Sequence, residues 1–251
     1  MGELCNLRYL GLKDTKELKF VAEGLEMLTD LRTLHRFMVC DDKGKTRGCN
    51  INELKDLKKL KGELSIEGLR GGMVKVIDPK KVELNLKHEL IGVKFIFEEQ
   101  GDDKVDSASE ERGLLETLEP PHGIERLVIG GYKGDTRPEW YLDTNYEELR
   151  LERCPSWAAV IGIKSLKKLE VSNCPTLGAL PSMPLLKLKT LARMPALESL
   201  YIRDCDGLNT IGDMPAVKTL ILIDLPNWEP TFTSMPCLRK GIFEKCPKME
   251  T

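Results

Sequence analysis

The most regular feature of the chain is a short alternation of apolar and polar residues that recurs along its C-terminal half. The copies read IERLVIGGY (124–132), YEELRLERCPSW (146–157), LKKLEVSNCPTL (166–177), LESLYIRDCDGL (197–208), VKTLILIDLPNW (217–228) and LRKGIFEKCPKM (238–249). Aligned on Leu127, Leu149, Leu169, Leu200, Leu220 and Gly241, they are spaced by 22, 20, 31, 20 and 21 residues. A fixed period of this length indicates a repeat protein in which each copy supplies one structural unit.

An alternating stretch of about five residues predicts a short β-strand with its leucines on one face and its polar residues on the other. One such strand has no partner for its apolar face, so successive copies must stack side by side as a parallel sheet over a continuous core. Four of the five spacings fall within the roughly 20–29 residues of leucine-rich repeats. We therefore predict an α/β leucine-rich-repeat solenoid, a horseshoe with a short-stranded parallel sheet on its concave face.

The N-terminal half carries weaker copies of the pattern, which we interpret as early irregular repeats within residues 1–97. They read LRYLGL (7–12), LRTLHRFMV (31–39), LKKLKGELSI (57–66) and LIGVKFIF (90–97). INELKDLKKL (51–60) places its four apolar residues at three-residue steps and predicts a helical stretch. The sequence leaves the repeat register open in residues 1–97 and 178–195, where the 31-residue interval indicates an expanded or degenerate unit.

The segment 98–113 interrupts the repeats with acidic and small residues and is predicted to be a solvated loop. After it, a helix with Leu114, Leu115 and Leu118 facing inward is expected to stop at Pro120–Pro121. Residues 114–251 then hold the later repeats with LxLxxC turns. Because repeats stand on both sides of the loop, we expect residues 1–251 to form a single leucine-rich-repeat domain.

The polar positions of the predicted strands form a ladder on the concave face, and this ladder is the predicted partner-binding surface. Its later rungs expose aromatic and aliphatic side chains beside charged ones, as protein-binding surfaces do. The alternative is that these residues belong to the core, because a register slip of one residue would exchange the two faces. The candidate partner-binding residues are Arg150, Glu152, Glu170, Ser172, Tyr201, Arg203, Ile221 and Ile223.

Composition narrows the function classes. Apolar residues make up 41% and charged residues 31% of the 251 residues, and the formal net charge is −2. These values predict a packed core and give no overall attraction to nucleic acid or anionic membranes. No apolar stretch approaches the roughly 18 residues of a membrane-spanning helix. Because signal-peptide features and Asn-x-Ser/Thr sequons are also missing, we expect a cytoplasmic location.

No motif for chemistry emerges from the sequence. The eight cysteines include no Cys-x-x-Cys, and no histidine stands at zinc-ligand spacing from one. KGKT (43–46) lacks the first glycine of a phosphate-binding loop, because Val39 occupies that position. The pairs Glu110–Glu111 and Glu147–Glu148 are predicted to be solvated. We therefore expect no enzyme activity, no metal and no cofactor in this chain.

Four cysteines recur at one position of the repeat, three residues after the last apolar strand residue: Cys154, Cys174, Cys205 and Cys246. The leucine-rich-repeat consensus places Asn or Cys there, where the chain turns out of the strand. A small side chain with weak hydrogen-bonding capacity packs beneath such a turn. We expect these residues to be buried structural thiols.

Three stretches together resemble the leucine-rich-repeat region of plant intracellular disease-resistance receptors of the coiled-coil, nucleotide-binding class. They are 31–69, which contains LRTLHRFMVCDD and INELKDLKKLKGELSIEGL; 114–141, in which Tyr-x-Gly is followed by Pro-x-Trp; and the run of LxLxxCP repeats. The resemblance covers essentially the whole chain. The nucleotide-binding domain and the coiled coil of such receptors are not in this sequence, so we expect a fragment or a truncated homologue.

The resemblance implies a protein-interaction module of plant innate immunity. Its partners would be a pathogen effector or a guarded host protein, together with an intramolecular contact to a nucleotide-binding domain that contributes to autoinhibition. ADP or ATP would then bind only in that domain. The alternative is a leucine-rich-repeat substrate adaptor of a ubiquitin ligase or another non-immune protein-binding scaffold, which would carry an F-box-like segment upstream.

Overall fold

The structure is a computed structural model that describes residues 3–13, 15, 17–18, 21, 23–39, 50–71, 82–98, 107–134, 136–142, 145–157, 160, 163–178, 194–212, 214–230 and 235–249. It divides into two compact units. The first comprises Met1–Leu127 with Pro138–Thr144, and the second comprises Val128–Arg137 with Asn145–Thr251.

The first unit pairs short and longer parallel strands. Its elements are β1 (Tyr9–Leu10), η1 (Leu25–Met27), β2 (Thr33–Leu34), β3 (Arg36–Met38), η2 (Ile51–Leu54), β4 (Gly62–Leu69), η4 (Leu84–Leu86), β5 (Leu90–Phe97), α2 (Ser107–Thr117) and η5 (Glu139–Leu142). Strand β1 pairs with β2, and β4 pairs with β3 on one side and β5 on the other. The strand copies predicted in the N-terminal half are therefore present.

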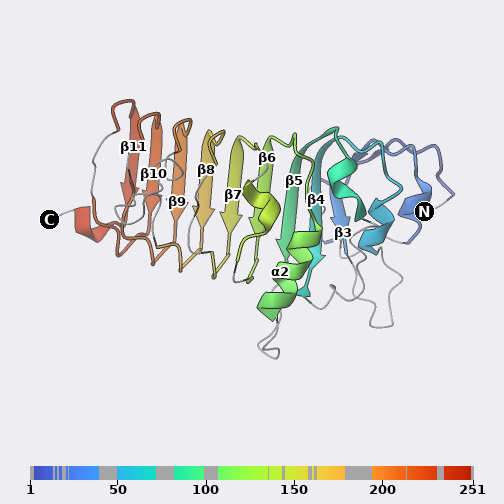
Figure 1. Cartoon of the computed structure of the whole chain (residues 1–251), viewed down its shortest axis with the longest axis horizontal. Helices are drawn as coiled ribbons and strands as arrows, with labels where there is room; N and C mark the ends of the chain where they lie inside the picture. The colour runs from blue at the N-terminus through green and yellow to red at the C-terminus, as the bar shows by residue number, and fades with distance from the viewer. Residues whose placement is uncertain are drawn as a thin grey trace. The chain divides into compact units, whose positions relative to one another are not determined.

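The second unit contains the regular repeats, and strand β6 (Arg126–Gly130) begins in the first unit and ends in the second. Its further elements are β7 (Glu148–Glu152), β8 (Lys168–Ser172), β9 (Ser199–Arg203), β10 (Thr219–Ile223), β11 (Lys240–Glu244) and the turn η6 (Pro247–Met249). Strands β7 to β11 lie side by side in chain order and pair in parallel (Figure 1). The predicted strand copies thus form a stacked parallel sheet.

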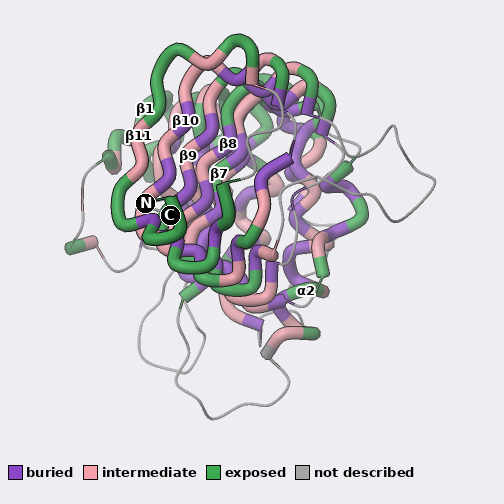
Figure 2. Tube along the Cα trace, turned by 90° about the vertical axis from the view of Figure 1, so that its left-hand side faces the viewer, coloured by how far each residue is buried: buried purple, intermediate pink, exposed green. Residues whose placement is uncertain are grey.

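The register of this sheet follows the alignment of the repeats. Leu149 pairs with Leu169, which pairs with Leu200; Leu200 pairs with Leu220, and Leu220 with Gly241. Along β7 to β10 every second side chain is buried and the others remain partly or fully exposed. Figure 2 shows the alternation as purple segments between pink and green ones. The alternative of a one-residue slip is therefore excluded for these strands.

The 31-residue interval before β9 does not contain another strand of this sheet between β8 and β9. Lys168 to Ser172 pair directly with Ser199 to Arg203, one residue against one. The interval is therefore an expanded connection between neighbouring strands, and residues 179–193 lie outside the described part of the chain.

Two sequence predictions in the first unit require correction. The predicted loop 98–113 is not a loop throughout, because α2 begins at Ser107; residues 99–106 lie outside the described part. Glu111, predicted to be solvated, lies on this helix and is only 1% exposed. The acidic and small residues of the segment concealed the helix, because that composition is typical of a solvated loop. The inward positions of Leu114, Leu115 and Leu118 are confirmed.

The predicted helical stretch 51–60 is shorter than expected. Only Ile51–Leu54 are helical, as a 3-10 turn, yet Ile51, Leu54, Leu57 and Leu60 are all buried. The turn begins at a capping box, in which the Asn50 side chain accepts from the Asn52 N–H at 3.0 Å and Glu53 accepts from the Asn50 N–H at 3.0 Å. The periodicity therefore predicted the buried face correctly but overestimated the helix.

The turns η1 and η2 bring the carboxyl groups of Glu26 and Glu53 close together. Glu53 Oε2 accepts hydrogen bonds from the Gly24 and Leu25 N–H groups at 3.0 and 2.9 Å, and Glu26 lies beside it. Burial, together with the hydrogen bond to Glu26, raises the pKa of Glu53 to about 7. The same carboxyl–carboxylate hydrogen bond lowers the pKa of Glu26. The pair therefore keeps one proton in the range where an isolated glutamate would have lost it.

This pair predicts a loss of stability as the pH rises. The unfolded chain releases the Glu53 proton near pH 4.5, whereas the folded chain holds it until about pH 7. The contribution of Glu53 is thus complete below pH 4.5 and is lost as the pH rises through 7, whereas the contribution of Glu26, whose pKa is lowered, is lost only as the pH falls below 4.5. Thermal unfolding followed from pH 5 to 7.5 should show a falling Tm, and Glu53→Gln should flatten the slope. Equal slopes for the two proteins would contradict this assignment.

Candidate functional site

The open face of the second unit, formed by the outward positions of β7 to β11, is the candidate functional site. Because the strands pair residue for residue, these positions form columns across the sheet. The central column is Arg150, Glu170, Tyr201, Ile221 and Ile242, and the following column is Glu152, Ser172, Arg203, Ile223 and Glu244. All eight candidate residues predicted from the sequence therefore lie on this one face.

The β7 and β8 part of the face is a charged patch of Arg150, Glu152, Lys168 and Glu170. Arg150 forms ion pairs with Glu152 on its own strand and with Glu170 on the next, the latter at 3.4 Å. Lys168 Nζ lies 2.8 Å from Glu170 Oε1. These charges already satisfy one another, and such exposed pairs contribute little to stability. They give the patch polarity and a defined geometry.

The β9 to β11 part of the face is an apolar patch of Tyr201, Ile221, Ile223 and Ile242. Each of these side chains is partly exposed, although core residues beside them such as Leu220 and Leu222 are 0% exposed. Arg203 borders the patch and pairs with Asp204 at 2.9 Å. A hydrogen bond with Tyr201 and the charge of Asp204 raise the pKa of Arg203, so the guanidinium remains charged. Partly exposed aliphatic and aromatic groups held on a rigid sheet are typical of binding surfaces.

A further row of charges, not predicted from the sequence, is formed by the residue immediately before each of the strands β7 to β11. Its members are Glu147, Lys167, Glu198, Lys218 and Arg239. Lys167 pairs with Glu147 at 2.6 Å, and Lys218 pairs with Glu198 at 2.9 Å. The signal was available, because charges of alternating sign recur at the repeat period one residue before the strand. The alternation ends at Arg239, where a second cation follows Lys218.

The ends of the strands are closed by a repeated turn. Arg153, Asn173, Asp204, Asp224 and Lys245 all have positive φ, between 52° and 54°. This left-handed conformation suits Asn and Asp better than Arg or Lys. It lets the N–H of each of the first four reach the carbonyl of the neighbouring strand, as Asn173 N does with Arg203 O at 3.0 Å. The turns thereby fix the register of the face.

The four recurrent cysteines lie directly beneath these turns, as predicted. Cys154, Cys174 and Cys205 are 0% exposed and Cys246 is 7% exposed. Each thiol donates to the carbonyl of the residue two positions earlier, at 3.3–3.4 Å. The hydrogen bond with Cys154, together with burial, raises the pKa of Cys174 to about 12, and burial raises that of Cys246. These groups are structural thiols rather than nucleophiles.

Thiol labelling should therefore distinguish these residues from the exposed Cys5 and Cys237. In a variant with Cys5, Cys40, Cys49 and Cys237 replaced by serine, Ellman's reagent at pH 8 should label no thiol within minutes. At this pH, a thiol with a pKa of about 12 is ionised in only about one molecule in ten thousand. Denaturation in urea should release all four. Rapid labelling of the native variant would show that the turns are open.

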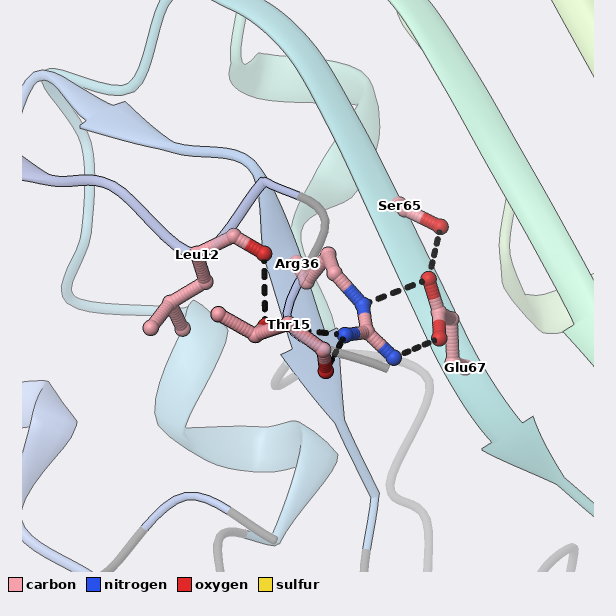
Figure 3. A network of polar contacts seen from close by, with 5 residues as sticks. All are labelled: Leu12, Thr15, Arg36, Ser65 and Glu67. Atoms are coloured by element: carbon pink, nitrogen blue, oxygen red, sulfur yellow. Dashed lines mark hydrogen bonds and ion pairs between the residues drawn. The ribbon is translucent and has the colours of Figure 1, made fainter. Parts of the chain in front are cut away.

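The corresponding face of the first unit is organised differently. Arg36 on β3 donates from Nε and Nη2 to the two carboxylate oxygens of Glu67 on β4, at 3.1 and 2.7 Å, and from Nη1 to the Thr15 hydroxyl at 3.0 Å (Figure 3). Ser65 donates to Glu67 at 2.8 Å, and Thr15 donates to the Leu12 carbonyl at 2.8 Å. Burial raises the pKa of Glu67, but the bonds from Arg36 and Ser65 outweigh it and the net shift is downward. This closed network ties neighbouring turns together.

Metal sites, a phosphate-binding loop or membrane-spanning helices would indicate other functions. Within them, no group of three or more His, Cys, Asp or Glu side chains is arranged to hold a metal ion. The segment KGKT lies outside the described part. A search of the described helices finds none with the length and apolar character to span a membrane.

Comparisons with known proteins agree with the resemblance seen in the sequence. Residues 51–155 match a family model described as R13L1/DRL21 leucine-rich repeats. The disease resistance RPP13-like protein 1 of Arabidopsis thaliana is 30% identical over 115 residues, which cover 43% of this chain and 11% of that protein. The disease resistance protein RGA1 of Solanum bulbocastanum is 29% identical over 147 residues, which cover 57% of this chain and 14% of that protein. No solved structure matches.

The chain thus corresponds to a small part of the length of these two relatives. The family match, residues 51–155, covers the last two early repeat copies and the first two later ones almost completely. The sequence copies that follow, from residue 166 onward, have the same pattern and form the strands β8 to β11. The fold and the comparisons lead to one conclusion: the chain is an α/β solenoid of leucine-rich repeats similar to those of plant disease-resistance proteins.

Proposed function

We propose that the chain is the protein-interaction module of a plant innate immune receptor and that the open face of its second unit binds the recognised protein. The partner would be a pathogen effector or a guarded host protein. The observation that carries this proposal is the apolar patch, in which Tyr201, Ile221 and Ile242 stand in register on neighbouring strands. The names of the two relatives support the role in plant defence.

The two patches suit different parts of binding. The apolar patch offers anchors whose burial against a partner would release water, at about 25 cal/mol per Å² of apolar surface. The charged patch beside it offers Arg150, Glu152 and Glu170 as polar contacts at the rim, and Ser172 stands in register between Glu152 and Arg203. Charges of this kind affect selectivity and association rate more than affinity.

The proposal extends to autoinhibition. In a full-length receptor, part of this repeat array would contact a nucleotide-binding domain and hold it inactive until the partner is bound. ADP or ATP would bind in that domain, and this chain would hold no cofactor and catalyse no reaction. The buried free thiols of the second unit suit the reducing cytoplasm, where we propose that the protein acts.

Quantitative affinity capture from plant leaf extract tests the binding role. A tagged chain carrying Tyr201→Ala and Ile221→Ser should lose specific partners by at least about tenfold, because central aromatic and aliphatic anchors dominate interface energies. The matched control carries Tyr9→Ala and Ile91→Ser, which replace the same residue types at exposed positions of the first unit. Circular dichroism must show that both variants are folded.

The two variants should differ if the open face is the binding surface. The control should retain the proteins captured by the unmodified chain, and the patch variant should not. If the patch variant retains every specific partner, or if both variants lose them equally, the open face of the second unit is not the binding surface.

A further inference from the structure

The apolar patch has cations at one end and an anion at the other. Arg239 and Lys240 stand at the start of β11, and both side chains are exposed. Lys218, at the start of β10, is paired with Glu198 at 2.9 Å. Within the described part of the chain, neither Arg239 nor Lys240 forms an ion pair. We call Lys218, Arg239 and Lys240 the basic corner.

Lys240 of the basic corner adjoins the apolar patch on the same face of the sheet. Lys240 pairs in register with Thr219, and two residues further along each strand Ile242 pairs with Ile221. Side chains two residues apart on one face of a strand are separated by roughly 7 Å. If one residue of a bound partner packs over Ile221 and Ile242, the next residue of that partner therefore lies within reach of Lys240.

The opposite end of β11 carries the opposite charge. Glu244 is exposed and is in no ion pair with a described residue, and it pairs in register with Ile223. It lies four residues from Lys240, which corresponds to roughly 13 Å along an extended strand. The apolar patch thus lies between a cationic end and an end that carries the carboxylate of Glu244 and the ion pair of Arg203 with Asp204. An acidic group is favoured at the first end, where the cations have no ion-pair partner among the described residues, and is not favoured beside Glu244 at the second.

We propose that the basic corner and the apolar patch together recognise an extended protein segment in which an acidic residue adjoins an aliphatic or aromatic one. The apolar residue packs against Ile221 and Ile242, and the carboxylate pairs with Lys240 and Arg239. This inference rests on the proposed function and specifies the chemistry of the partner. Charge complementarity supports it, because binding over this corner would otherwise desolvate two unpaired cations without compensation.

A random library of 12-residue displayed peptides is the probe. Selection uses the whole chain, and counter-selection against the folded Tyr201→Ala/Ile221→Ser variant retains the peptides that need the apolar patch. The retained peptides should be enriched in Asp or Glu next to an apolar residue. Their affinity should fall at least about tenfold for Arg239→Glu/Lys240→Glu, and it should fall steeply between 50 and 500 mM salt.

Glu244→Gln is the matched control, because it changes an exposed charge on the same strand at the other end of the patch. It should leave the affinity of the acidic peptides unchanged or raise it. The inference is overturned if the patch-dependent peptides are neutral or basic, if charge reversal at the basic corner has no effect, or if no patch-dependent peptide emerges. The proposed function is tested independently of this inference, and it is wrong if the Tyr201→Ala/Ile221→Ser variant still captures the natural partners.

Discussion

Replacing Leu220 by alanine is expected to lower the free energy of unfolding of the second unit by about 2–5 kcal/mol. Leu220 is 0% exposed and stands in register between Leu200 and Gly241. Because Gly241 supplies no side chain, the neighbouring turn has little with which to fill the space. Ile221, the next residue along the strand, is partly exposed on the open face, and Ile221→Ala should cost less than about 1 kcal/mol.

Urea unfolding followed by tryptophan fluorescence measures this difference, since Trp157 and Trp228 are buried in the second unit. Leu220→Ala should lower the free energy of unfolding strongly, whereas Ile221→Ala should leave it nearly unchanged and weaken partner binding instead. Similar losses of stability at the two positions would mean that β10 does not present alternate residues to the core and to solvent.

Gly207→Ala is expected to destabilise the second unit by about 2–4 kcal/mol, a large effect for one added methyl group. A Cβ at this position would lie 2.3 Å from the Pro175 carbonyl oxygen and 3.2 Å from that of Leu177. Both atoms belong to the backbone of the preceding turn, so relief requires two successive turns to move apart. The packing of turn on turn therefore depends on this glycine.

Gly178→Ala is the matched control, because its Cβ would meet nothing nearer than the Thr176 carbonyl oxygen at 3.9 Å. Thermal unfolding should give a clearly lower Tm for Gly207→Ala and a Tm within about 2 °C of the unmodified chain for Gly178→Ala. A Gly207→Ala protein as stable as the control would show that the turns are looser than the structure indicates.

The repeat period allowed the sequence to predict most of the second unit. The spacing of Leu149, Leu169, Leu200 and Leu220 set the register, and the alternation around them set the two faces, because a strand has no other way to bury one side. The recurrence of cysteine after four of the strands predicted the burial of Cys154, Cys174, Cys205 and Cys246. These features are local and repeat, so each copy reinforced the interpretation of the others.

Features that depend on contacts between turns were harder to predict from the sequence. Nothing in the composition around Glu111 indicated that this carboxylate is buried, because its burial follows from the placement of α2. The role of Gly207 appears only when the preceding turn is in place beside it. The ion pairs Glu147–Lys167 and Glu198–Lys218 required the register to be known, after which the sequence alone would have indicated them.

For the candidate site, too, some features could be predicted from the sequence and others could not. The placement of the eight candidate residues on one face was predicted correctly, since it follows from the alternation, and their role in binding stays a prediction. Which of them stay available to a partner could not be predicted. Arg150 and Glu170 are engaged with each other, whereas Lys240, which was not among the candidates, has no ion-pair partner in the described part of the chain.

Photo-crosslinking from the open face most directly tests the claim that this surface binds protein. A photoreactive phenylalanine analogue is placed in plant cells at position 201, at position 221 or at the exposed position 9 of the first unit. We predict discrete protein adducts from positions 201 and 221, weakened by Ile223→Ser, and none of these adducts from position 9. Adducts that are the same from all three positions, or absent from positions 201 and 221, would contradict it.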